Sequence, residues 1–253
     1  MQETPALHLS GVTKRFGAKV AVAGIDLTVP PRSMFGLVGP NGAGKTTALS
    51  MAVGLLRPDA GTASILGVDV WAEPDAAKAL IGVLPDGLAL PERLTGPELL
   101  TFTGLLRGLD PADVAARSAE LLDVLDLADA GSTLVIDYSA GMRKKIGLAT
   151  ALLHRPRLLL LDEPVEVVDP VSAAGIRAIL RRFVAAGGAV VVSSHVMALV
   201  ESLCDHLAVM AAGSVVAAGP LDQVRGGGTL EEAFVGLVGG RTAGRDGLSW
   251  LVS

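Results

Sequence analysis

The chain has 253 residues and a net charge of −5, so it lacks the excess of Lys and Arg that proteins binding duplex nucleic acid carry. Half of the residues are apolar but only 3% are aromatic, so the core must be built from Leu, Val, Ala and Ile. The single cysteine, Cys204, excludes an intrachain disulfide and is consistent with a reducing compartment.

No stretch of the sequence is typical of a membrane span. The longest segment free of Asp, Glu, Lys and Arg, 183–200, is interrupted by Gly187-Gly188 and by Ser193-Ser194-His195, which predicts a strand, a turn and a helix. The first residues, M-Q-E-T-P-A-L-H, lack the basic start and apolar segment of a secretion signal. We therefore expect a cytoplasmic protein, and any membrane process that it serves needs a second chain to supply the membrane spans.

The N-terminal third is predicted to be rich in strands, because short apolar runs alternate there with turn residues. The predicted strands cover 7–12, 25–29, 34–38, 64–66 and 81–84. Turns are expected over 13–17, which contains Phe16, and over 56–61. From the residues alone, Phe16 is better explained as a cover of the apolar core than as a side chain that stacks on a base.

A glycine-rich loop follows the third predicted strand. Residues 39–47 read G-P-N-G-A-G-K-T-T and are followed by an apolar helix, which is the context that the phosphate-binding pattern G-x-x-x-x-G-K-[ST] requires. Its glycines let the backbone curl so that successive N–H groups point at phosphate oxygens, and the helix adds its positive end. Lys45 can bring a full charge to the β- and γ-phosphates, and the Thr46 hydroxyl can bind Mg²⁺. The alternative is a glycine-rich turn before an ordinary helix, but the flanking strand and helix favour nucleotide binding.

Residues from Gly96 to His154 are predicted to be all helical. Apolar residues recur there at helical spacing in three segments, and no strand is expected between Pro91 and Arg155. The sequence therefore predicts a helical insert within an α/β body.

The α/β pattern then resumes at L-L-L-L-D-E-P, residues 158–164. Four consecutive leucines predict a strand buried on both faces, and Asp162 and Glu163 follow at the edge where α/β sheets bind ligands. We expect a helix over 170–186, and the remaining predictions are a strand at 189–192, a helix after His195, a hairpin over 207–218 and a short helix over 230–238.

Together these motifs resemble the ATP-binding subunit of an ABC transporter. The resemblance covers about residues 5 to 240 and depends on the order of the glycine loop, Y-S-A-G-M at 138–142, L-L-L-L-D-E-P and His195. It implies an α/β P-loop NTPase cassette over 1–240, with a mixed sheet, an N-terminal antiparallel β region and a helical subdomain over about 88–155. Residues 241–253 would form a C-terminal tail.

The resemblance implies that two cassettes, identical or different, dimerise head to tail and bind ATP and Mg²⁺ between them. One side of each ATP would contact Phe16 by stacking, Val22 as a lesser contact, and the glycine loop residues Gly39, Pro40, Asn41, Gly42, Ala43, Gly44, Lys45, Thr46 and Thr47. The partner's signature, Ser139, Ala140, Gly141 and Met142, would contact the γ-phosphate. The residues themselves leave open a simpler role for Ser139 as the N-cap of a helix, and they favour a solvated helix face for Arg143, Lys144 and Lys145.

The resemblance also assigns the catalytic roles. Asp162 would hold Mg²⁺, Glu163 would polarise the attacking water, and His195 would sense the γ-phosphate, with Lys45 neutralising charge. Asp169 is kept in the loop that faces the dimer interface.

Three positions depart from the family pattern. Asp86 stands where the family commonly has a Gln that reaches Mg²⁺, so either a metal contact or an ordinary Pro85-Asp86-Gly87 turn is consistent with it. Ala140 and Met142 replace residues of L-S-G-G-Q, a variation similar to that of drug, antibiotic and lipid exporters. Glu166 replaces a Ser, and a buried anion near the dimer interface would shift affinity or slow turnover.

The function implied by the resemblance is ATP hydrolysis that powers export of a small molecule, drug or lipid through a separate transmembrane permease. The chain would be cytoplasmic, peripheral on the inner face of the cell membrane, and would not bind nucleic acid. The alternatives are a soluble ABC-type ATPase, or a nucleotide-binding cassette with weak hydrolysis.

Overall fold

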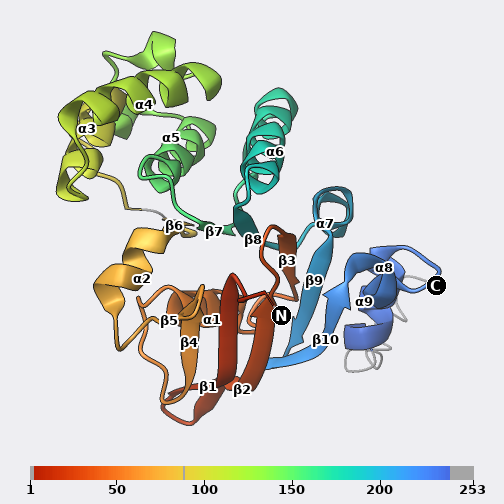
Figure 1. The fold of residues 1–253 in the computed structure, drawn as a ribbon. Coiled ribbons are helices and arrows are strands. Elements are labelled where there is room, and N and C mark those ends of the chain that lie inside the picture. The colour runs from red at the N-terminus through yellow and green to blue at the C-terminus, as the bar shows by residue number, and fades with distance from the viewer. Residues whose placement is uncertain (1–2, 88, 240–253) are drawn as a thin grey trace, which may run out of the picture.

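The computed structural model describes residues 3–87 and 89–239, whose strands form two sheets (Figure 1). The first sheet is antiparallel, with strand order β2-β1-β4-β5. Its strands are β1 (Leu7–Phe16), β2 (Lys19–Val29), β4 (Ala60–Ile65) and β5 (Val68–Asp69).

The second sheet has strand order β10-β9-β3-β8-β7-β6, and its pairs are parallel except for β9 with β10. Its strands are β3 (Met34–Val38), β6 (Ile81–Leu84), β7 (Leu158–Asp162), β8 (Ala189–Ser194), β9 (His206–Ala211) and β10 (Ser214–Pro220). The predicted α/β fold with a mixed sheet and an antiparallel region is confirmed.

The mixed sheet is buried on both faces, and β7 shows why its sequence is four leucines. Leu158 and Leu160 pack in the core shared with the antiparallel sheet and α1 (Lys45–Ala52). Leu159 and Leu161 point to the opposite core, which the other helices cover. Because successive side chains alternate between faces, only a run of apolar residues satisfies both cores.

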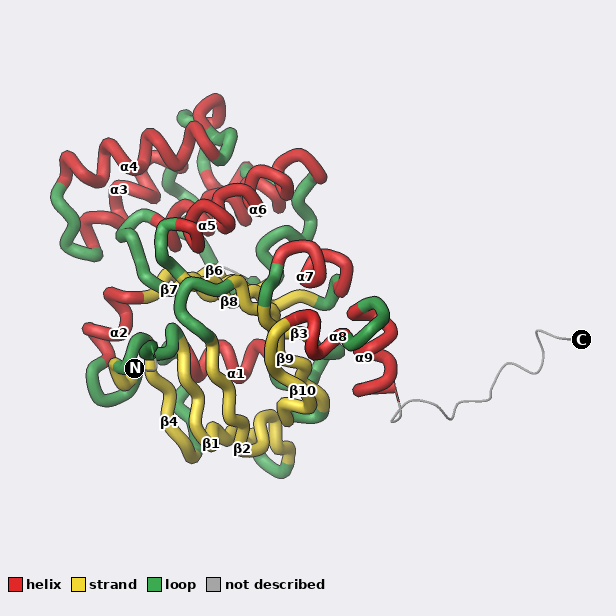
Figure 2. The backbone as a smooth tube through the Cα atoms, turned by 45° about the vertical axis from the view of Figure 1, so that its right-hand side comes forward, coloured by secondary structure: helices red, strands yellow, loops and turns green. Residues whose placement is uncertain are grey.

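Figures 1 and 2 place helices α3 to α6 on the side of the mixed sheet opposite the antiparallel sheet. Three of them come between β6 and β7 in the sequence: α3 (Gly96–Leu106), α4 (Pro111–Val124) and α5 (Ala140–Leu152). Each begins at a side-chain cap, Thr95, Asp110 or Ser139, that satisfies free N–H groups of the first turn. Within the described residues this stretch contains no strand beyond the isolated bridge Thr95↔Leu134, so the predicted helical character is confirmed.

The remaining helices lie outside this segment of the sequence. They are α2 (Pro74–Leu80), α6 (Pro170–Ala185), α7 (Met197–Leu203), α8 (Leu221–Arg225) and α9 (Leu230–Val238), and there are 3-10 turns at Ala128–Ala130 and Val135–Asp137. Helices α2 and α8 and strand β5 were not predicted, because such short elements leave little periodicity in the sequence.

The predicted turns in the antiparallel sheet were wrong in extent. Pairing of β1 with β2 continues to Phe16↔Lys19, so the turn is confined to Gly17 and Ala18 and Phe16 ends a strand. Strand β4 begins at Ala60, inside the predicted turn, because Ala60 already pairs with Thr13 of β1. The two strands lie so close there that a Cβ on Gly61 would be 2.5 Å from backbone atoms of Gly11.

No helix within the described ranges, 3–87 and 89–239, is long and apolar enough to cross a membrane. The predicted tail 241–253 lies outside the described residues.

Candidate active site

The strand register brings the predicted site residues to one edge of the mixed sheet. Val38 pairs with Ser194, Asp162 pairs with Ser193, and Leu84 pairs with Leu161. The segments that follow these strands therefore emerge together at the carboxyl ends, where open α/β sheets bind ligands. They carry the glycine loop, the Asp162-Glu163 pair, His195 and Asp86.

The glycine loop is held so closely against its neighbours that side chains are excluded at two positions. A Cβ on Gly39 would lie 2.4 Å from the carbonyl oxygen of Met210, and one on Gly44 would lie 2.4 Å from that of Ala21. Gly44 also has φ 102°, in the left-handed region, at the N-cap of α1. The loop therefore turns directly into the helix, whose free N–H groups form an anion-binding end.

Lys45 is buried, and its ammonium group points toward the carbonyl oxygens of its own loop. Its Nζ donates hydrogen bonds to the carbonyl oxygens of Gly39, at 2.6 Å, and Pro40, at 3.3 Å. Burial lowers the pKa of the Lys45 ammonium, and the charges of Glu163 and Asp162 oppose that shift. A phosphate at this loop would offer the ammonium a fully charged partner in place of neutral carbonyls.

A cavity of about 260 Å³ opens beside the loop and receives most of the predicted ATP contacts. Its lining is Phe16, Lys19, Ala21, Asn41, Gly42, Ala43, Gly44, Lys45, Thr46 and Thr47. Phe16 is half-exposed at the end of β1, which favours the stacking interpretation over the core interpretation. The structure does not place Val22 in this cavity: it is fully buried in the core below, and its Cγ2 would lie 3.4 Å from a Cβ on Gly44.

Asp162 is a buried carboxylate surrounded by hydroxyl groups. Its Oδ2 accepts a hydrogen bond from Thr46 Oγ1 at 3.1 Å, and its Oδ1 accepts one from Ser193 Oγ. In the described part of the chain, no cluster of three or more His, Cys, Asp or Glu residues can hold a metal by itself. One carboxylate and one hydroxyl at a phosphate loop nevertheless fit Mg²⁺, which binds through one or two carboxylates plus substrate phosphates.

Glu163 is held by the last residue of β8 and by the residue after it. Its Oε1 lies 2.8 Å from His195 Nδ1 and accepts a hydrogen bond from the His195 backbone N–H at 3.0 Å, and its Oε2 accepts one from Ser194 Oγ at 3.3 Å. The hydrogen bond between the His195 ring and the Glu163 carboxylate raises the pKa of the imidazole. The negative charge of Glu163 raises it further, and Glu166 makes a smaller contribution. The carboxylate is therefore fixed in direction at the edge of the phosphate loop.

Sequence reasoning missed Ser193 and Ser194 as supports of the two acids. The signal was present, because two hydroxyl residues end an otherwise apolar strand that pairs with β7. Both serines are fully buried, so their hydroxyls must bond to partners in the site.

The signature residues lie outside this cavity, on a different part of the molecule. Ser139 and Ala140 are exposed, and the Ser139 Oγ accepts a hydrogen bond from the Met142 N–H at 3.2 Å, as an N-cap of α5. A Cβ on Gly141 would lie 3.6 Å from the carbonyl oxygen of Val167. The signature thus lies against the loop that follows Glu163, not against the glycine loop of the same chain.

That loop holds two of the expected interface residues. Asp169 caps α6, accepting hydrogen bonds from the N–H groups of Val171 and Ser172, and these bonds lower the pKa of its carboxyl. Glu166, expected as a buried anion at the dimer interface, is exposed in the single chain. Val167, with φ 58°, occupies the left-handed region, which is strained for a β-branched residue.

The prediction that residues 143–145 form a solvated helix face was wrong. Lys145 is only 7% exposed, and each of the three bases pairs with an acid from another segment. The pairs are Arg143–Glu92 at 3.0 Å, Lys144–Asp86 at 3.6 Å and Lys145–Asp126 at 3.5 Å. The fold brings acids 19 to 58 residues away in sequence to this helix, so helical spacing could not reveal them.

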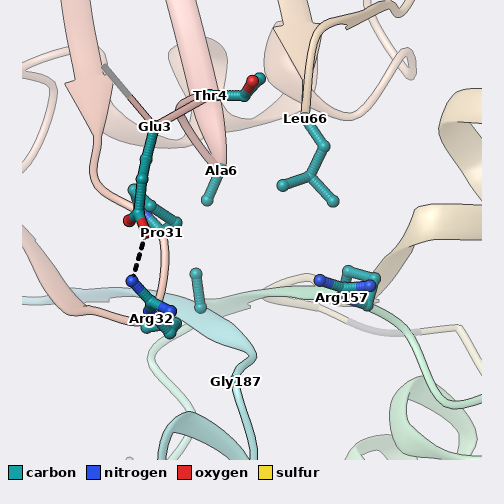
Figure 3. Close-up of a pocket in the computed structure, with 9 residues that line it drawn as sticks. Glu3, Thr4, Ala6, Pro31, Arg32, Leu66, Arg157 and Gly187 are labelled. Carbon is teal, nitrogen blue, oxygen red and sulfur yellow. Dashed lines mark hydrogen bonds and ion pairs between the residues drawn. The ribbon is translucent and has the colours of Figure 1, made fainter. Parts of the chain in front are cut away.

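A second hollow of about 300 Å³ lies away from these residues, between the N-terminal segment and the loops around Arg32 and Gly187 (Figure 3). Arg32 pairs there with Glu3, and Arg157 lines the opposite side. It contains none of the predicted site residues, so we place the active site at the glycine loop.

Comparisons with known proteins identify the family. The model of the family described as "ABC transporter" matches residues 22–166. The daunorubicin/doxorubicin resistance ATP-binding protein DrrA of Streptomyces peucetius is 39% identical over 224 residues, which cover 88% of this chain and 68% of that protein. The Nod factor export ATP-binding protein I of Cupriavidus metallidurans is 37% identical over 216 residues, 85% of this chain and 71% of that protein.

Among solved structures, the ATP-binding subunit of an ABC transporter superposes with a TM-score of 0.86 at 29% identity, covering 92% of this chain and 99% of that one. The phosphate loop, the paired acids and the signature are thus found together in a chain whose sequence and fold both match. The chain belongs to the ABC transporter family, as one of its ATP-binding, ATP-hydrolysing subunits.

Proposed function

We propose that this subunit binds ATP between two cassettes and hydrolyses it to drive export of a small molecule, drug or lipid through a separate transmembrane permease. The observation that carries the proposal is the convergence of Lys45, Asp162, Glu163 and His195 beside one phosphate loop. The similarity to proteins of daunorubicin/doxorubicin resistance and of Nod factor export supports the direction of transport.

Nucleotide binding would use groups that are already in place. Phe16 would stack on the adenine at the mouth of the cavity, and the N–H groups of residues 41–47 would surround the phosphates. Lys45 would exchange its contacts with Gly39 and Pro40 for the β- and γ-phosphate oxygens.

Thr46 and Asp162 would hold Mg²⁺, with Asp86 as a further oxygen ligand, and the ion would supply charge neutralisation at the phosphates. Glu163 would orient the attacking water and accept its proton, since His195 and Ser194 fix the direction of its carboxylate. His195 is half-exposed, so its imidazole remains available to the γ-phosphate.

The other half of the site would come from a second cassette. Ser139 is exposed and Gly141 is half-buried at the start of α5, which offers a hydroxyl, a close backbone approach and a helix N-terminus. None of these groups lines the cavity of its own chain, so a head-to-tail partner is the natural source of the missing contacts.

The permease would dock on the helical part of the subunit. Phe102, Leu105 and Leu106 lie on one face of α3 at helical spacing and are exposed, which is the pattern of a helix face awaiting an apolar partner. This face follows the loop after Asp86, which we expect to belong to the same coupling surface; Leu88 in that loop lies outside the described residues.

The shared site is tested by mixing two inactive variants. Lys45→Ala removes the phosphate contact, and Gly141→Glu blocks the signature, so neither homodimer should hydrolyse ATP. In the mixed dimer one site carries both lesions and the other carries none, and mixing should therefore restore ATPase activity. If the mixture stays inactive while a mixture containing wild-type chain is active, the two halves do not come from different chains.

A further inference from the structure

The base on α5 that lies nearest the predicted metal site is Lys144. Its Nζ donates a hydrogen bond to the carbonyl oxygen of Asp162 at 3.4 Å and pairs with Asp86 Oδ1 at 3.6 Å. The Lys144 side chain is only 14% exposed, whereas that of Asp86 is 60% exposed. One ammonium therefore contacts the carboxyl ends of both β6 and β7.

The neighbouring bases on the same helix do not reach this edge. Arg143 pairs with Glu92, and it also donates to the carbonyl oxygen of Val135; Lys145 pairs with Asp126. Within the described residues, neither of these bases forms a hydrogen bond or ion pair with β7, whereas Lys144 donates to the carbonyl oxygen of Asp162 at the end of that strand. Of these three bases, only Lys144 connects α5 to the metal side of the site.

The charges at this edge explain why a base is placed there. Asp86, Asp162 and Glu163 lie on adjacent strand ends, and Lys45 is engaged by its own loop. An amide at position 86 would carry no charge, whereas the carboxylate of Asp86 adds a negative charge to an edge that is already acidic. The Lys144 ammonium offsets that charge.

We propose that Lys144 is a positioning residue that holds Asp86 by this ion pair and competes with Mg²⁺ for its carboxylate. The proposal rests on the proposed function, because it concerns the metal bound with the nucleotide. Since Lys144 lies three residues after Gly141, the same pair ties the signature end of α5 to the metal side of its own chain.

The competition predicts that two substitutions breaking one ion pair act in opposite directions. Lys144→Met frees Asp86 and should lower the Mg²⁺ concentration that gives half-maximal tightening of ADP binding by about two- to fivefold, the range expected for a pair with one exposed partner. Asp86→Asn removes the metal contact and should raise that concentration. A merely structural pair would shift both variants in the same direction.

The measurement is a Mg²⁺ titration of a fluorescent ADP analogue bound to the full chain, with affinity in EDTA as reference. Arg143→Gln is the matched control, because it removes the same charge from the same helix turn and leaves Asp86 alone; it should leave the Mg²⁺ midpoint unchanged. Lys144→Arg keeps the charge and should stay within twofold of wild type.

An unchanged midpoint in Lys144→Met, or an equal shift in Arg143→Gln, overturns the proposal. If Lys144→Met does not fold, the proposal is carried by Asp86→Asn and Lys144→Arg, and a midpoint for Asp86→Asn equal to that of wild type overturns it. Failure of the proposed function gives a different result, namely no ADP binding by the wild-type chain in EDTA or Mg²⁺.

Discussion

The catalytic edge and the signature turn of this cassette are built in opposite ways. On the catalytic edge, comprising loop 39–47, Asp162, Glu163 and His195, the acids are held by side chains from other strands or loops. On the signature turn, Ser139–Met142, the only side-chain hydrogen bond among the described residues is the local cap, in which Ser139 Oγ accepts from the Met142 N–H. The first region is complete enough to bind a nucleotide, whereas the second presents exposed groups to a surface outside the chain.

This difference separates binding from turnover. A preassembled edge loses little entropy when ATP binds, because its side chains are already ordered. In the proposed mechanism the signature turn would contribute nothing to that step and would act only when two chains meet. Substitutions in the two regions should therefore fail in distinguishable ways.

The largest effect is expected from Glu163→Gln on the catalytic edge. The amide keeps the shape and accepts a hydrogen bond but cannot take a proton, so the hydrolysis rate should fall about 10²- to 10⁴-fold. ATP affinity should remain within about twofold of wild type, because Glu163 does not line the nucleotide cavity. Gel filtration with ATP should then show a stable dimer, and turnover at the wild-type rate would remove Glu163 from its role.

A smaller effect is expected from Ser139→Ala on the signature turn. The substitution should leave ATP binding by the single chain unchanged and weaken the ATP-dependent dimer about tenfold, the loss expected for a hydrogen bond to a charged group. It should also destabilise the fold by about 1 kcal/mol, because it removes the N-cap of α5.

Ser139→Asn separates these two roles. Asn is as good an N-cap as Ser, so the unfolding free energy should stay close to wild type while dimerisation is still impaired. Equal dimerisation of wild type and Ser139→Asn in the Glu163→Gln background would reduce Ser139 to a helix cap.

The sequence allowed the catalytic edge to be predicted much further than its surroundings. Strand β7 was predictable because burial on both faces demands four apolar residues, and the glycine loop because close backbone approach excludes side chains at Gly39 and Gly44. Lys145 was mispredicted because its partner, Asp126, is distant in sequence, and helical spacing does not report such pairs. Val22, which the resemblance implies as a lesser contact, is fully buried beneath the loop and does not line the cavity, so its contact with nucleotide stays a prediction.

The smallest effect concerns the link between Glu163 and His195. The raised pKa of His195 depends first on its hydrogen bond with Glu163 and then on the charge of that residue, so Glu163→Gln should return the pKa toward the ordinary value of about 6.5. Titration of the imidazole Cε1 proton by NMR, assigned with His195→Gln, measures the change directly. An equal pKa in both proteins would mean that the pair does not form in solution.

The same link should make stability depend on pH. Because the folded-state pKa lies above the unfolded value, the stabilisation is fully present below about pH 6.5 and is lost as the pH rises through the folded-state pKa. The contribution should be below about 1 kcal/mol, since His195 is half-exposed and solvent screens the pair. The difference in unfolding free energy between wild type and His195→Gln should therefore shrink between pH 6 and pH 9. A difference that grows over this interval would contradict the sign of the shift and would indicate a neutral imidazole at the catalytic edge.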